Sequence, residues 1–136
     1  MKMFIIIFMS FMTIFTCKAS ENYDIDSLLN AIKFVESKNG KYTDGKNGEI
    51  GSYQIKKIVI DDVNRILNKK IFKYDDALDE NKSREICRIY ILYWSKKYNV
   101  NTTECMARIW NGGPRGYRKE STVKYWHKIR RVLNEL

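Results

Sequence analysis

Every glycine of this chain, and its one proline, lies in one of two short segments. Four glycines fall between positions 40 and 51, and the other three fall between 112 and 116 beside Pro114. Glycine permits a positive φ and lets another segment or a ligand approach the backbone closely. Elsewhere the apolar residues recur at helical spacing. The chain therefore predicts two glycine loops on a mainly α frame of five to six helices, with at most a short β-hairpin.

The expected helices follow from apolar spacing and from capping residues. The first should begin near Asp24 or Asp26, and Gly40 is placed to end it. Four more are expected over 55–68, over 82–98, from Thr102 or Thr103 to 110, and after a cap at Ser121. Between the first two lies a polar loop, the first glycine segment (residues 39–51), in which Asp-Gly and Asn-Gly turn pairs permit a hairpin. The second glycine segment (residues 111–116) follows the fourth helix.

Residues 1–19 have the pattern of a secretory signal peptide. Lys2 supplies a positive charge, Met3 to Phe15 is almost unbrokenly apolar, and Ala19 suits a cleavage site. At about a dozen residues, the run is shorter than the roughly 20 that a spanning helix needs. An uncleaved anchor is the alternative. We expect a secreted or periplasmic protein with a single domain over 20–136.

The composition limits the partners and the chemistry of this domain. Removing residues 1–19 removes two lysines and no acid, which leaves 23 basic and 16 acidic side chains, a net charge of +7. Such a protein is attracted to polyanions, including bacterial walls and nucleic acid. Two cysteines remain, Cys87 and Cys105, and an even count in an oxidising compartment predicts a disulfide, with two buried thiols as the alternative. With one histidine, we expect no metal and no cofactor.

Glu36 is the first candidate for chemistry. It follows Leu28 and Ile32 at helical spacing, so it lies at the edge of the apolar stripe in the last turn of the first helix. A carboxyl group against apolar packing is partly desolvated, and its pKa rises. Such a group can deliver a proton near neutral pH, as glycosidic cleavage requires. A solvated glutamate at a helix end is the alternative.

Four short motifs follow one another along the chain. They are Glu36-Ser37, Gly51-x-x-Gln54-Ile55, Asn111-x-Gly113 and an aromatic last helix that contains Tyr125. This order and spacing resembles the goose-type lysozyme and soluble lytic transglycosylase superfamily, over nearly all of residues 20–136. The resemblance implies a lysozyme-like catalytic domain. It departs from the family where Ser52-Tyr53 replace Leu-Met and Ile109-Trp110 replace Ala-Tyr.

The resemblance also implies roles for individual residues. Glu36 matches the catalytic acid/base, and a tyrosine like Tyr125 approaches that glutamate. The residues expected to bind substrate are Ser37, Gly51, Gln54, Asn111, Gly113 and Tyr125. From their positions beside the glycine segments, Tyr53 and Trp110 are added as aromatic rings that could stack on sugars. We assign Trp126 to the core and His127 to the surface or a half-buried position.

The implied activity is cleavage of the β-1,4 bond between N-acetylmuramic acid and N-acetylglucosamine in peptidoglycan glycan strands. Attack by water would make the protein a lysozyme, and attack by the sugar's C6 hydroxyl would make it a lytic transglycosylase. A second carboxylate would favour water. Asp44 and Glu49 are the candidates, but turn formation explains Asp44 and solvation explains Glu49, and we favour these explanations, more strongly for Glu49.

Two other classes of function remain open. A non-catalytic domain of the same fold could bind wall glycans, although it would have no need of Glu36. A basic helical protein could bind nucleic acid, but its cations would be concentrated on one helix face. Here they are dispersed, with the densest cluster in the last helix. We expect a monomer that binds peptidoglycan strands and not nucleic acid, with chitin oligomers as a second substrate left open.

Overall fold

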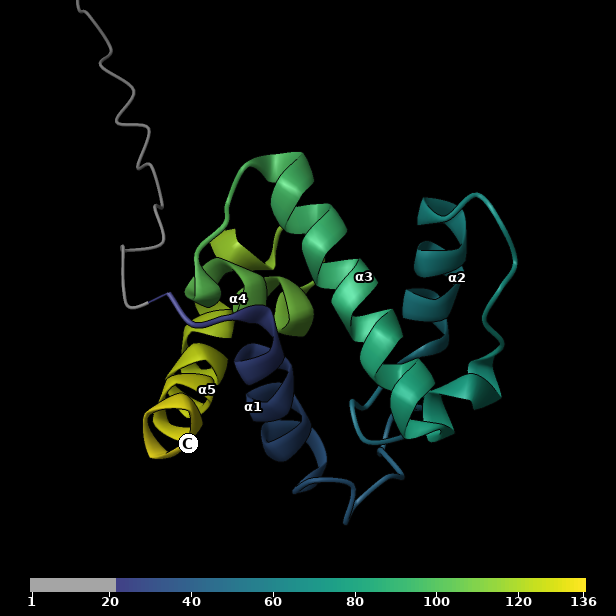
Figure 1. Ribbon diagram of the computed structural model, residues 1–136, viewed down its shortest axis with the longest axis horizontal. Helices are drawn as coiled ribbons and strands as arrows, with labels where there is room; N and C mark the ends of the chain where they lie inside the picture. The colour runs from purple at the N-terminus through teal and green to yellow at the C-terminus, as the bar shows by residue number, and fades with distance from the viewer. Residues whose placement is uncertain (1–21) are drawn as a thin grey trace, which may run out of the picture.

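The computed structural model describes residues 22–136, and this part of the chain is mainly α, as predicted (Figure 1). Its five α-helices are α1 (Ile25–Ser37), α2 (Lys57–Ile66), α3 (Glu80–Tyr98), α4 (Thr103–Gly112) and α5 (Val123–Glu135). Short 3-10 turns lie at Tyr74–Leu78, Gly116–Arg118 and Glu120–Thr122. The predicted signal peptide, residues 1–19, lies outside the described residues.

The long helix α3 separates two unequal parts of the molecule. On one side, α1, α4 and α5 pack against one another, and α1 and α4 also pack against α3. On the other side, α2 packs on α3, and the segment after it returns to the start of α3 (Figure 1). Fully buried aliphatic side chains fill the first part and the core face of α3, among them Leu29, Ile32, Ile91, Ile109 and Ile129. Tyr53, between α1 and α2, is also fully buried. The smaller part holds Ile60 and Val63 of α2 against α3.

Three of the helix starts are capped by the side chain of the preceding residue. The carboxylate of Asp24 accepts hydrogen bonds from two backbone N–H groups of α1, as expected for an N-cap. Asp79 caps α3 in the same way through the N–H of Lys82, and Thr102 caps α4 through the N–H of Cys105. These residues satisfy backbone donors that would otherwise lack partners in the first turn.

Two predicted helix ends are wrong. The helix α1 ends at Ser37, because Lys38 already has a left-handed conformation with φ of 54°, so Gly40 plays no part in terminating it. Ser121 does not cap α5. The residue before that helix is Thr122, whose hydroxyl instead binds the carbonyls of Gly116 and Lys119. At the end of α1, a non-glycine residue adopts the left-handed conformation that glycine was expected to supply. At the start of α5, tertiary hydrogen bonds engage the hydroxyl of the residue that precedes the helix.

The first glycine segment contains the only extended pairing in the part of the chain that the structure describes. Ile50 forms isolated antiparallel bridges with Asp44 and with Ile55, so the permitted hairpin is reduced to single residue pairs. Gly51 has φ of 78°, and a Cβ on it would stand 1.7 Å from the carbonyl oxygen of Ala77. Only glycine fits this contact, which holds the first glycine segment against the turn before α3.

A buried arginine fixes the second glycine segment to the frame. The guanidinium of Arg108 is 4 % exposed and pairs with Glu104 on the same helix at 2.8 Å. It also donates to the hydroxyl of Thr122 at 2.9 Å and to the carbonyl of Lys119 at 3.2 Å. Because this cation is shared between α4 and the turns that follow it, the loop is held close to the end of α4.

Within residues 22–136, no helix is both long and apolar enough to cross a membrane.

Candidate active site

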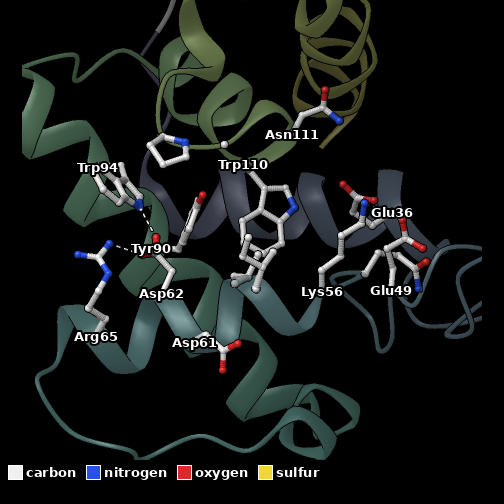
Figure 2. Close-up of a pocket in the computed structure, with 15 residues that line it drawn as sticks. Glu36, Glu49, Lys56, Asp61, Asp62, Arg65, Tyr90, Trp94, Trp110 and Asn111 are labelled. Carbon is white, nitrogen blue, oxygen red and sulfur yellow. Dashed lines mark hydrogen bonds and ion pairs between the residues drawn. The ribbon is translucent and has the colours of Figure 1, made fainter.

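A cleft of about 800 Å³ lies between α2 and the C-terminal end of α4, with α3 behind it (Figure 2). Each neighbouring element contributes to its walls. The lining residues are Glu36 of α1; Glu49, Gln54 and Lys56 of the loop; Ile58, Val59, Asp61, Asp62 and Arg65 of α2; Tyr90 and Trp94 of α3; and Trp110, Asn111, Gly113 and Pro114. Both glycine segments therefore border one cleft.

The two ends of this cleft differ in their side chains. We call them the Glu36 end, where Glu36, Glu49 and Lys56 gather, and the Asp62 end, where Asp62, Arg65 and Trp94 gather (Figure 2). Between them stand the rings of Trp110 and Tyr90, whose centroids are 5.9 Å apart in an edge-to-face arrangement. Aromatic faces of this kind suit the apolar faces of sugar rings.

Glu36 lies in the last turn of α1 and is half-buried. The pKa of its carboxyl is raised from 4.5 to about 7, chiefly by burial and to a smaller degree by the negative charge of Glu49. Hydrogen bonding by Tyr125 and Trp110, together with the charge of Lys128, acts in the opposite direction. Desolvation dominates because no cation pairs directly with this carboxyl in the described part of the chain. Near neutral pH, Glu36 can therefore donate a proton and then accept one.

Tyr125 of α5 fixes the position of the Glu36 carboxyl. The hydroxyl of Tyr125 donates a hydrogen bond to Glu36 Oε1 at 2.7 Å, and this tyrosine is 8 % exposed. Burial raises the pKa of the Tyr125 hydroxyl well above its usual value, as does the adjacent Glu36 charge, so it remains a donor. The indole nitrogen of Trp110 is turned toward the same carboxyl (Figure 2). Tyr125 is therefore a positioning residue that does not itself line the cleft.

The first glycine segment places Gln54 and Glu49 in the cleft. Gln54 has a strained backbone with φ of 50°, and its side-chain amide donates to the carbonyls of Thr43 at 3.1 Å and Gly51 at 3.0 Å. This amide ties the two sides of the loop together. Glu49 accepts a hydrogen bond from the backbone N–H of Asn47 at 2.8 Å and faces Lys56 Nζ at 3.3 Å.

These contacts separate the two candidates for a second carboxylate. Backbone hydrogen bonding, mainly from Asn47, lowers the pKa of Glu49, with a smaller contribution from Lys56. Its side chain is 18 % exposed and lines the cleft, so Glu49 is partly solvated and also borders the site. Asp44 is exposed, pairs with Ile50 through the backbone and does not line the cleft, as expected of a turn residue.

The Asp62 end holds a carboxylate whose partners are all in place. Trp94 Nε1 donates to Asp62 Oδ2 at 2.9 Å, and the guanidinium of Arg65 forms an ion pair with the other oxygen. Arg65 also lies over the Trp94 ring, 5.9 Å from its centroid. The result is a neutralised polar wall with an aromatic edge. Such a surface can bind a ligand, but it offers no acid or base.

Four of the predicted substrate-binding residues do not line the cleft: Tyr125, described above, and Tyr53, Ser37 and Gly51. Tyr53 is fully buried, with its hydroxyl accepting from Arg84 at 3.0 Å, so the prediction that its ring stacks on sugar is wrong. Ser37 is 1 % exposed and its hydroxyl donates to the carbonyl of Ser52 at 2.7 Å. Gly51 is buried in its contact with Ala77. Ser37 and Gly51 shape the loop and do not touch a ligand. Trp126 is buried and His127 is exposed, as assigned.

The predicted disulfide is wrong, because Cys87 is a free thiol. It is fully buried on the core face of α3, where desolvation raises its pKa well above the usual value. An even count of cysteines carries no information about which positions a helix turns inward. No group of three or more potential metal-ligating side chains occurs among residues 22–136.

The sequence reasoning missed the wall formed by α2 and α3. Asp62, Arg65 and Trp94 meet only because α2 packs across α3 at this point. The amphipathic pattern of α2 was visible, and an acid followed by an arginine three residues later indicated a local pair. Nothing in the sequence aligned that pair with Trp94.

Comparison with models of known protein families and with curated protein sequences finds no match for this chain.

Proposed function

We propose that this protein is a glycosidase that cleaves peptidoglycan glycan strands at the bond between N-acetylmuramic acid and N-acetylglucosamine, with Glu36 as the acid/base. The observation that carries the proposal is a half-buried carboxyl in a cleft, with a pKa of about 7 and a tyrosine hydroxyl that fixes its orientation. A general acid is most effective when its pKa lies near the working pH.

The shape and lining of the cleft support a polymeric sugar as the ligand. The cleft extends from Glu36 past Trp110 and Tyr90 to Trp94, so a chain of several rings could lie along it (Figure 2). Polar groups that could bind sugar hydroxyls and acetamido groups are interspersed with these rings, including the exposed Asn111 and the half-buried Gln54. Each of the first three motifs that resemble the goose-type lysozyme and lytic transglycosylase superfamily contributes a lining residue, and the fourth contributes Tyr125, which binds Glu36.

The first step is transfer of the Glu36 proton to the glycosidic oxygen. The bond from C1 to that oxygen then breaks, the sugar fragment bearing the free 4-hydroxyl leaves, and positive charge develops at C1. The ionised Glu36 that remains is stabilised by the Tyr125 hydroxyl at 2.7 Å. Attack on C1 by water leaves a reducing muramic end, and attack by the sugar's own C6 hydroxyl leaves a 1,6-anhydro end.

The proposal includes export, since peptidoglycan lies outside the cytoplasmic membrane and residues 1–19 have the pattern of a signal peptide. We expect a monomer that needs neither metal nor cofactor. A net positive charge after cleavage would attract the protein to the anionic wall, independently of the bond that it cleaves.

The test is mass spectrometry of purified peptidoglycan incubated with the protein or with Glu36→Gln. Glutamine has the same shape and can still accept from Tyr125, but it has no proton to transfer. We expect muropeptides from the wild type and a rate lower by about 10²- to 10⁴-fold in the variant. If a folded wild-type protein sediments with peptidoglycan and yet releases nothing, it is a glycan-binding domain and not a glycosidase.

A further inference from the structure

Glu49 is a second carboxylate in the cleft, and the function proposed above does not use it. It lines the Glu36 end together with Glu36 and Lys56 (Figure 2). Its charge is close enough to raise the pKa of Glu36. In the part of the chain that the structure describes, no hydrogen bond joins the two carboxyl groups, so they do not share a proton. The Glu36 end therefore holds two separate carboxyl groups facing one space.

The loop holds this carboxylate in a defined place. Glu49 Oε2 accepts from the N–H of Asn47 at 2.8 Å, and the backbone oxygen of Glu49 accepts from the N–H of Gly45 at 2.7 Å. The chain closes around it at Gly45, where an added Cβ would stand 2.5 Å from Glu49 Oε2 and 2.7 Å from Gln54 Oε1. Gly45 thus leaves the room that both side chains occupy.

The surroundings of the two carboxyl groups suit opposite roles. Glu36 is desolvated and receives a tyrosine hydroxyl, whereas Glu49 receives a backbone N–H and lies 3.3 Å from the ammonium of Lys56. The first environment favours the protonated form and the second favours the carboxylate. Two carboxyl groups whose environments differ in this way are the usual arrangement of an acid and a base in one site. Asp44, in the same loop, has no such environment and is exposed.

We propose that Glu49 is a catalytic general base that activates water, so that this protein hydrolyses the strand and is a lysozyme in place of a lytic transglycosylase. The inference rests on the proposed function and completes its reaction. Water loses one proton to Glu49 and its oxygen bonds to C1. The bond from C1 to the glycosidic oxygen breaks, and that oxygen takes the proton of Glu36. Exchange of one proton with solvent restores both carboxyl groups.

The experiment compares Glu49→Gln with Asp44→Asn, a matched control in the same loop that removes a carboxylate outside the cleft. Products from peptidoglycan are identified by mass spectrometry after reduction, which separates reducing from 1,6-anhydro ends. We expect the wild type and Asp44→Asn to give reducing ends at similar rates. For Glu49→Gln we expect hydrolysis to fall by about 10²- to 10⁴-fold, with 1,6-anhydro ends as the larger share of what remains.

A second variant tests the base directly. In Glu49→Ala, added sodium azide should restore cleavage and yield a glycosyl azide, because azide attacks C1 without a proton that a base must remove. Azide should have no effect on Asp44→Ala. Circular dichroism and thermal unfolding establish that each variant is folded. Glu49 lies at a loop surface, so its replacement should leave the fold intact.

The outcomes separate this inference from the function on which it rests. Cleavage that depends on Glu36 but gives only 1,6-anhydro ends in the wild type would overturn the role of Glu49 and keep the glycosidase. An unchanged rate and product pattern in Glu49→Gln would do the same. Absence of cleavage by the wild type, or full activity of Glu36→Gln, would overturn both proposals.

Discussion

The two ends of the cleft each hold a carboxyl group beside a tryptophan, yet the two groups are prepared for different tasks. Asp62 has both the N–H of Trp94 and the guanidinium of Arg65 as partners, so its charge is compensated. Glu36 has a neutral tyrosine hydroxyl at 2.7 Å and no direct cation, and burial raises its pKa to about 7. The two carboxyl groups therefore differ in whether a counter-charge is present, and under the proposed function this difference makes Glu36 the proton donor.

At the Asp62 end, the charge of the carboxylate is compensated by its partners. An ion pair with an exposed arginine contributes little to stability, but together with the Trp94 N–H it holds the Asp62 carboxylate in a fixed orientation in the cleft wall. At the Glu36 end, ionisation costs the folded protein stability at neutral pH, because burial disfavours the charged form of Glu36 and the negative charge of Glu49 adds to this effect. Strain of this kind is expected where a site is built for proton transfer.

Among the substitutions that test this comparison, Glu36→Gln should have the largest effect, measured as the change in the free energy of unfolding with pH. The folded pKa of Glu36 is about 7 and its ordinary value is 4.5, so the folded state binds the proton more tightly. Stability from this group is fully present below pH 4.5 and is lost as pH rises through 7. Relative to the variant, the wild type should lose about 2 to 3 kcal/mol between pH 4 and pH 8.

Urea unfolding of both proteins at several pH values measures this difference, and titrations common to the two proteins cancel. A constant gap between the two free energies of unfolding would show that Glu36 keeps its ordinary pKa. In that case desolvation would not be the source of its acid/base character.

The next effect should come from Tyr125→Phe, which removes the hydroxyl that stabilises the ionised Glu36. Hydrogen bonds to charged groups are worth about 1.5 to 3 kcal/mol. The pKa of Glu36 should therefore rise by about one to two units, and the alkaline limb of the pH–rate profile should move up accordingly. The profile is measured with soluble muropeptide chains. An alkaline limb that stays in place, or moves to lower pH, would contradict the role given to Tyr125.

The smallest effect should come from Asp62→Asn at the compensated end. Asparagine can still accept from Trp94 Nε1, and only the ion pair with Arg65 is lost. Because that arginine is exposed, unfolding free energy should change by less than about 1 kcal/mol at any pH. We expect kcat to be unchanged and KM for long strands to rise a few-fold. A large loss of kcat would mean that the Asp62 end takes part in the chemistry.

Local signals account for much of the helical frame. Asp24 and Thr102 cap the helices that their positions predicted, and the apolar spacing placed all five helices within a few residues. Errors arose where a residue had a better partner in the tertiary structure. Thr122 displaced Ser121 as the residue before α5, because the hydroxyl of Thr122 is held by Arg108 and by two carbonyls.

The candidate site shows the same division. The position of Glu36 at the edge of an apolar stripe predicted a raised pKa, since helix periodicity alone determines which residues border the core. Trp110, beside a glycine segment, lines the cleft as expected. Tyr53 also lies beside a glycine segment, but it is fully buried, and its hydroxyl accepts a hydrogen bond from Arg84. Sequence neighbours do not reveal which way a loop side chain turns.

The sequence by itself determined the helical class, the two loops that border the cleft and the glutamate at its edge, because these depend on interactions within a few residues. Only the tertiary structure decided that Tyr125 binds Glu36 across 89 positions, that Cys87 stays a free thiol and that Glu49 enters the cleft while Asp44 does not. Burial and electrostatic coupling depend on distance in space, which the packing of α1, α3 and α5 sets and local patterns do not encode.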